Sequence, residues 1–187
     1  MRKLMAIIFA IAISAPAFAD RPNPFFFGDT QNQMGVQLGQ SAGPGAILTI
    51  IPGNGWDLEP FQVIALQYSQ PTEFFRLPAR LNLHAGFFVA WNNMADDYND
   101  PFAGASLDVA FFQWDDFYLG AGLGGYIKPT YDGRMDSLLM FGTKIFLGYR
   151  FADLWSVEIY SQHMDNAGLM AVNGGYNFFG LQVLRNF

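Results

Sequence analysis

The chain has no cysteine and few charged residues, and both absences narrow what it can be. Without cysteine it has no disulfide framework, no thiol nucleophile and no thiolate metal site. Charged residues make up 14% of the sequence, against roughly 25% in average proteins. The 10 basic residues are outnumbered by 16 acidic ones, so the basic surface that nucleic-acid binding requires is missing. The 51% content of hydrophobic residues argues against a disordered chain.

Long hydrophobic runs are also nearly missing. The single one, residues 4–13, is shorter than the roughly 20 residues that a membrane-spanning helix needs. It follows the basic pair Arg2 and Lys3 and precedes Ala17-Phe18-Ala19, which has the small-x-small pattern of a cleavage site. We therefore predict a cleaved signal peptide at residues 1–19 and one mature domain at residues 20–187. The mature protein then works beyond the inner membrane of a bacterium.

Period-two alternation runs through the mature chain, in segments of about ten residues separated by polar turns. Large apolar side chains share one face of each segment, whereas charges, amides and glycines share the other. Leu81 and Leu83, for example, alternate with Arg80, Asn82 and His84. The pattern predicts strands at residues 33–41, 60–69, 79–91, 104–113, 117–127, 138–150, 154–165 and 176–186.

A soluble β-sandwich would show the same alternation, but strand length and strand number favour a transmembrane barrel. Strands of about ten residues suit a tilted crossing of the membrane, and bacterial barrels have an even number of strands. Aromatic residues also stand near many strand ends, as an interfacial girdle requires. They are Trp56, Tyr68, Trp91, Trp114, Phe117, Trp155 and Phe187. We predict an all-β fold, an eight-stranded antiparallel β-barrel embedded in the bacterial outer membrane.

The lengths of the connections between strands support the barrel. With the N-terminus in the periplasm, the longer polar connections 42–59, 92–103, 128–137 and 166–175 lie outside, and tight turns lie inside. Residues 70–78 break the rule and are expected to form a periplasmic plug or belt. A barrel of this size is filled by side chains and leaves no open channel. The expected interior polar network contains Arg80, His84, Asp108, Lys144, Arg150 and Glu158.

One group of residues could carry chemistry. Alternate residues of a strand point to the same face, so the row of Val157 and Ile159 continues with Ser161, His163 and Asp165. These three residues extend the lipid-facing row at the outward end of their strand. Polar side chains on such a row are costly unless they have a purpose. A hydroxyl, an imidazole and a carboxylate supply a candidate nucleophile, base and orienting group. The ordinary alternative is a wet strand end, where these residue types are common.

No other cluster predicts chemistry. The acidic residues 96–100 lack the spacing of an EF-hand, so we expect neither a metal nor a cofactor. The glycines at residues 120–125 lie within a strand, where small interior side chains explain them better than phosphate binding does. His84 falls on the interior face and is expected to be a satisfied interior histidine.

The stretch His163-Met164-Asp165-Asn166-Ala167-Gly168, with Asn177 further on, resembles the PagL lipid A 3-O-deacylase family. That family has an eight-stranded outer-membrane barrel and the pattern His-x-Ser-Asn-Ala-Gly, followed by a Glu at the start of the last strand. It hydrolyses the ester-linked acyl chain at the 3-position of lipid A. The resemblance makes His163 the base and matches Asn166 to the family's Asn.

Two positions depart from the family pattern. Asp165 stands where the family has the nucleophilic Ser, and Asn177 stands where it has Glu. Three outcomes stay open: Ser161 acts as a rearranged nucleophile, with Asp165 or Asn177 orienting the imidazole; Asp165 and His163 activate a water; or the site is inactive. In an active site, the backbone N–H groups of Asn166, Ala167 and Gly168 are candidate oxyanion donors.

The leading functional hypothesis is an ester hydrolase of the lipid A 3-O-deacylase type, with lipopolysaccharide of the outer membrane as its substrate. The alternative is a small non-enzymatic outer-membrane barrel with a structural or surface-binding role. Association into a homodimer is left open by the sequence.

Overall fold

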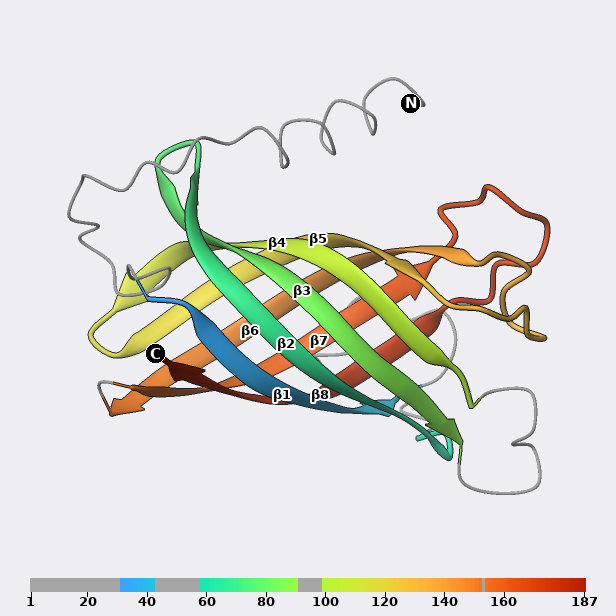
Figure 1. Ribbon diagram of the computed structural model, residues 1–187, viewed down its shortest axis with the longest axis horizontal. Helices are drawn as coiled ribbons and strands as arrows, with labels where there is room; N and C mark the ends of the chain where they lie inside the picture. The colour runs from blue at the N-terminus through green and yellow to red at the C-terminus, as the bar shows by residue number, and fades with distance from the viewer. Residues whose placement is uncertain (1–30, 43–57, 91–98, 153) are drawn as a thin grey trace.

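The computed structural model describes residues 31–42, 58–90, 99–152 and 154–187. Eight antiparallel strands follow one another around a closed barrel, in which β1 pairs with both β2 and β8 (Figure 1). The predicted fold class is therefore confirmed. The expected signal peptide and the aromatic residues Trp56 and Trp91 lie outside the described residues. Within those residues, no helix is long and apolar enough to cross a membrane. The strands are β1 (Gln33–Ser41), β2 (Phe61–Phe74), β3 (Leu77–Ala90), β4 (Pro101–Trp114), β5 (Phe117–Ile127), β6 (Leu139–Ala152), β7 (Trp155–Asp165) and β8 (Tyr176–Asn186).

The outer wall of the barrel is apolar, as the alternation predicts. Gln37, Gln67 and Gln182 are buried inside, while the leucines next to them in sequence point outward and are about half exposed. Large apolar side chains exposed all around the barrel mark a lipid-facing surface. Exposed aromatic residues gather at the end that carries the hairpin turns, as an interfacial girdle would. They include Trp114, Phe117, Trp155 and Phe187.

The expected plug or belt at residues 70–78 is wrong, because β2 and β3 continue as one hairpin to Phe74 and Leu77. The turn residues Phe75 and Arg76 both have positive φ, which a two-residue hairpin turn of the favoured twist requires. Pro71 and Pro78 resemble strand breaks in the sequence. The β1–β2 pairing ends at Ser69 and the β3–β4 pairing begins at Ala79. Each proline therefore lies where one edge of its strand has no partner among the described strands. A missing N–H costs little at such a position.

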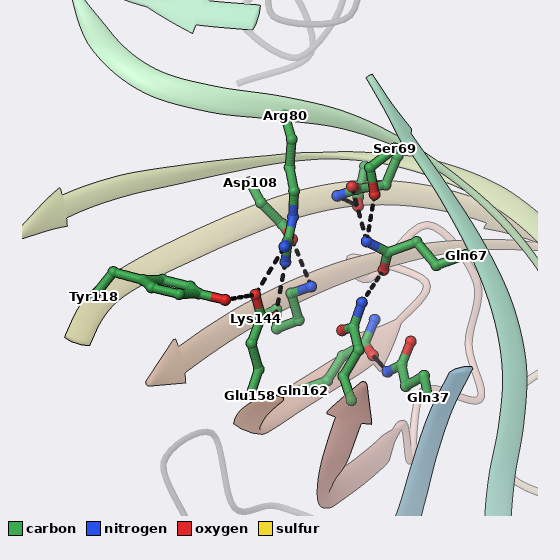
Figure 2. Close-up of polar contacts among 12 residues, drawn as sticks. Gln37, Gln67, Ser69, Arg80, Asp108, Tyr118, Lys144, Glu158 and Gln162 are labelled. Atoms are coloured by element: carbon green, nitrogen blue, oxygen red, sulfur yellow. Dashed lines mark hydrogen bonds and ion pairs between the residues drawn. The ribbon is translucent and has the colours of Figure 1, made fainter. Parts of the chain in front are cut away.

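A charged network fills the half of the interior nearest the hairpin turns. Arg80 donates to Asp108 at 2.8 Å and to Glu158 at 2.7 and 2.8 Å, and Lys144 donates to Asp108 at 2.6 Å. Figure 2 shows Arg80 between the two carboxylates, with the Tyr118 hydroxyl donating to Glu158 at 2.7 Å. Two basic and two acidic groups balance, as a buried network requires.

Two of the residues expected in that network, His84 and Arg150, do not contact Arg80, Asp108 or Glu158 through a hydrogen bond or ion pair between the described residues. His84 is buried in the interior, as predicted, but its Nε2 contacts Ser106 Oγ at 2.9 Å. Arg150 lies at the rim, where its Nε is 3.5 Å from Asp116 and its side chain is 30% exposed. Its parity on β6 is that of Lys144, but β6 has reached the end of the barrel at this point, so the side chain meets water.

The other half of the interior is aromatic, which the sequence analysis did not predict. Phe61, Phe88, Tyr176 and Phe178 stack with ring centroids 5.0–6.2 Å apart. Glycines on neighbouring strands make room for such rings: a Cβ at Gly104 on β4 would lie 2.3 Å from the ring of Tyr126 on β5, which packs against this layer through Phe102. A packed aromatic layer closes the end of the barrel that carries the long connections.

Candidate active site

The candidate residues lie on two neighbouring strands at the end of the barrel that carries the long connections. Ser161, His163 and Asp165 follow one another on the outward row of β7, and Asn177 on β8 stands directly opposite His163. The residues that alternate with them on β7, Tyr160, Gln162 and Met164, are buried and point into the barrel. They therefore do not contribute to the outer surface of the wall. The polar side chains are therefore fixed on the surface of the barrel that lipids contact.

His163 lies between an amide and a carboxylate. Its Nδ1 is 2.7 Å from Asn177 Oδ1, and its Nε2 is 3.3 Å from Asp165 Oδ2. Because an amide oxygen only accepts hydrogen bonds, Nδ1 carries a proton and donates a hydrogen bond to Asn177 Oδ1. Nε2 then faces a carboxylate oxygen, an arrangement that is favourable when the imidazole is also protonated there. Asn177 orients the ring, and Nε2 is directed to Asp165.

Asp165 is held from its other side by the backbone. Its Oδ1 accepts a hydrogen bond from the N–H of Ala167 at 2.9 Å, whereas Oδ2 faces His163 and also accepts from Asn173 Nδ2 at 3.5 Å. Ala167 and Gly168 both have positive φ, so the chain turns sharply just after the strand. The carboxylate is 27% exposed, which lets a small molecule reach it.

Ser161 is not part of this contact. Its neighbours across the sheet are Ile145 on β6 and Phe179 on β8, and the residue is buried, with 6% of its surface exposed. Within the described residues, no hydrogen bond joins Ser161 Oγ to His163. Successive residues on one face of a strand are about 7 Å apart, and nothing in this geometry brings the two side chains closer.

The expected oxyanion donors are bonded within the β7–β8 loop, residues 166–175. The N–H of Asn166 donates to Asn173 Oδ1 at 3.0 Å, and the N–H of Gly168 donates to Asn166 Oδ1 at 2.9 Å. Asn166 is fully buried, and its Nδ2 donates to the carbonyl of Val172 at 2.9 Å. These groups therefore shape the loop, and an oxyanion role requires one of the N–H groups to exchange its partner for substrate.

Gly175 closes the loop against the imidazole, and the sequence analysis did not single it out. Its φ is +63°, and a Cβ at this position would lie 3.1 Å from His163 Cε1. A side chain here would be strained by the backbone and would press on the ring. The pair Gly174-Gly175 just before the last strand is the sequence signal that could have identified it.

The β5–β6 loop, residues 128–138, braces the β7–β8 loop. The N–H of Gly174 donates to the carbonyl of Arg134 at 2.7 Å, and the N–H of Val172 donates to Asp136 Oδ1 at 3.3 Å. Arg134 in turn pairs with Glu59, which lies just before β2. Three outer segments are thus linked at the site, a contact between distant parts of the sequence that no local motif indicates.

Glu59 carries the negative charge that pairs with Arg134 in this brace. Burial by itself would raise the pKa of Glu59, but hydrogen bonds from Arg134 and Ser41, with the charge of Arg134, outweigh burial and hold that pKa below its usual value. The carboxylate is therefore charged at neutral pH and keeps its ion pair.

The described residues contain no group of three or more His, Cys, Asp or Glu side chains that could hold a metal ion. The side chains that contact one another at the site are those of His163, Asp165 and Asn177. An oriented imidazole beside a carboxylate can transfer protons to and from a reacting oxygen. Of the three outcomes that the sequence left open, this contact geometry favours water activation over a Ser161 nucleophile.

Comparisons with known proteins bear on the fold and on the family. The sequence model of the family described as lipid A 3-O-deacylase (PagL) matches residues 62–186, more than half of the 187-residue chain. Among solved structures, the chain is similar to the outer membrane enzyme PagL, with 17% identity and a TM-score of 0.55 over 81% of this chain and 97% of that one. It is also similar to the N-terminal β-barrel domain of Pseudomonas aeruginosa OprF, with 13% identity and a TM-score of 0.50 over 84% of this chain and 98% of that one. No curated protein sequence matches it.

Proposed function

The chain belongs to the lipid A 3-O-deacylase (PagL) family, and from this premise we propose that it hydrolyses the ester-linked 3-O-acyl chain of lipid A with a water activated by His163 and Asp165. The barrel is located in the bacterial outer membrane. The single observation that carries the proposed mechanism is the contact of His163 Nε2 with Asp165 Oδ2 at 3.3 Å, on the lipid-facing side of the wall.

The position of the pair suits a substrate that never leaves the membrane. His163 and Asp165 stand above the apolar row of Val157 and Ile159 on β7. An acyl chain lying along this row would place its ester linkage at the polar level of the site. Holding the two reactants in such an orientation is itself a large part of catalysis.

The reaction needs one proton acceptor and one proton donor. The Asp165 carboxylate takes a proton from water as the water oxygen attacks the ester carbonyl. Collapse of the tetrahedral intermediate breaks the bond to the sugar oxygen, which receives a proton from the His163 imidazolium. The products are a free fatty acid and a 3-hydroxyl on lipid A, and transfer of the proton from Asp165 to His163 Nε2 restores the starting state.

Asn177 takes the role of the group that orients the imidazole of His163. Its amide oxygen accepts from His163 Nδ1 at 2.7 Å, as a carboxylate would, but it carries no charge. The negative charge of the site is instead on Asp165, beside the reactive nitrogen. This placement supports the imidazolium where the leaving oxygen needs a proton.

The test is mass spectrometry of lipid A incubated in detergent micelles with the refolded barrel. We expect wild type to remove the mass of one 3-O-acyl chain. His163→Ala and Asp165→Ala should each slow the reaction by about 10²–10⁴-fold, the usual contribution of a positioned acid or base. Ser161→Ala should keep the activity, because its hydroxyl does not contact the imidazole.

Folding of each variant is checked by heat-modifiable gel mobility. Loss of activity in Ser161→Ala, with Asp165→Ala active, would replace water activation by a serine mechanism. No mass change with folded wild type would show that this member of the family is catalytically inactive. The structural or surface-binding role would then be the remaining function.

A further inference from the structure

The β7–β8 loop is apolar in composition, although it lies at the outer end of the barrel. Six consecutive residues, 167–172, carry neither a charge nor a polar side chain, and no charged residue occurs between Asp165 and Arg185. The other three outer connections each contain charged residues, such as Glu59, Asp96 and Lys128. A loop that extended into water would not be expected to differ from them in this way.

Its large side chains are also uncovered. Leu169 and Met170 are each 52% exposed and Val172 is 43% exposed, so they pack only partly against the protein. The loop holds them in place: Asn166 bonds the carbonyl of Val172 and the N–H of Gly168, and the N–H of Leu169 donates to the carbonyl of Asn166. A braced loop that presents apolar side chains is a surface for an apolar partner.

The apolar surface continues on both sides of the catalytic pair. Leu138 and Leu139 are exposed at the start of β6, and Ile159 and Leu181 are exposed on the wall between β7 and β8. His163 and Asp165 therefore form a polar island within a lipid-facing surface, with apolar side chains on the strands below and on the loop above. Water outside the membrane would not cover such an arrangement.

We propose that the β7–β8 loop lies in the outer leaflet and that Leu169, Met170 and Val172 hold the acyl chain that is cleaved at His163. The occupant is a fatty acyl chain of lipid A. This assignment of a binding surface rests on the proposed function, whereas the position of the loop in the leaflet does not depend on hydrolysis. The two parts are tested separately.

The position of the loop is measured with a single cysteine, because the chain has none of its own. Met170→Cys is labelled with an environment-sensitive fluorophore and reconstituted in phosphatidylcholine vesicles. The matched control is Gly133→Cys, an exposed position on the β5–β6 loop between Asp132 and Arg134. We expect brominated acyl chains to quench the label at 170 and aqueous iodide to quench the label at 133.

Equal quenching of both labels by iodide would overturn the proposal, since the loop would then lie in water. Shielding of position 170 that disappears when the protein is diluted to monomers would also overturn it, because a second copy of the chain would be the occupant. Lipid quenching that persists at dilution supports the proposal whether or not the enzyme turns over.

The acyl-binding role is measured by kinetics on lipid A. Leu169→Gln with Met170→Gln should raise KM by about tenfold, which corresponds to losing part of the contact of two apolar side chains. The value of kcat should change little, and a soluble ester with a short acyl group should be hydrolysed as by wild type. Tyr131→Gln, at an exposed position on the other loop, should leave KM unchanged. An unchanged KM in the double variant would refute the acyl-binding role.

Discussion

Replacing Arg80 by methionine should destabilise the barrel strongly, because this residue neutralises two carboxylates at once. Its guanidinium makes four hydrogen bonds to Asp108 and Glu158, at 2.7–3.2 Å, and all three side chains are at most 1% exposed. Without Arg80, Lys144 still pairs with Asp108, but Glu158 keeps only the Tyr118 hydroxyl among these partners. The interior then holds one uncompensated negative charge.

The magnitude follows from this geometry. Four charge-assisted bonds at about 1.5–3 kcal/mol each set an upper bound. The desolvation of Arg80 in the wild type offsets much of this, and removing one partner of a buried ion pair typically costs about 3–5 kcal/mol. With a urea slope of about 2 kcal/mol/M, the unfolding midpoint should fall by about 2 M.

The assay is urea unfolding of the refolded barrel in micelles, followed by tryptophan fluorescence. The matched control is Arg150→Met, which removes an arginine of β6 at the exposed rim and should cost less than about 1 kcal/mol. Adding Glu158→Gln to Arg80→Met restores neutrality and should recover part of the loss. Equal midpoints for Arg80→Met and Arg150→Met would refute the reasoning.

Three further changes test the site and its brace. Gly175→Ala should slow deacylation about tenfold in a folded barrel, because a left-handed backbone and a Cβ 3.1 Å from His163 displace the ring, whereas Gly174→Ala should not. Glu59→Gln should lower stability by under about 1 kcal/mol at pH 7. Because the pKa of Glu59 is depressed in the folded protein, that difference is present above its ordinary pKa of 4.5. Urea titrations should show it vanish as the pH falls from 4.5 through the lower pKa of the folded state. Asp165→Ser should make the barrel react with a fluorophosphonate probe, as gel fluorescence would show, and the wild type should not.

The sequence was sufficient for the fold because a membrane barrel repeats one simple rule. Each strand alternates between lipid and interior, so Leu38 and Gln37 are assigned to opposite sides without any knowledge of their neighbours. The aromatic layer around Phe88 escaped the same reasoning, because an interior position accepts any side chain that its neighbours leave room for. That room is set by glycines on adjacent strands, such as Gly104 beside Tyr126, and it depends on register.

The candidate site, too, was predictable only in part from the sequence. Parity placed His163 and Asp165 on one row, and the resemblance to the family added Asn177 on the next strand. Whether Ser161 or Asp165 approaches the imidazole depends on the turn after β7, where the N–H of Ala167 holds one carboxylate oxygen and leaves the other for Nε2. Such a contact requires coordinates, because residues two apart on a strand are equally spaced in sequence on either side of the histidine.

The two departures from the family pattern are best understood together. A neutral hydroxyl and a charged carboxylate flank the histidine in the family, whereas here the charged side chain, Asp165, and the neutral one, Asn177, have exchanged sides. Both partners still contact the imidazole, at 3.3 Å and 2.7 Å, so the ring remains oriented and keeps one carboxylate for its charge. The exchange supports the proposed hydrolysis by a water that His163 and Asp165 activate.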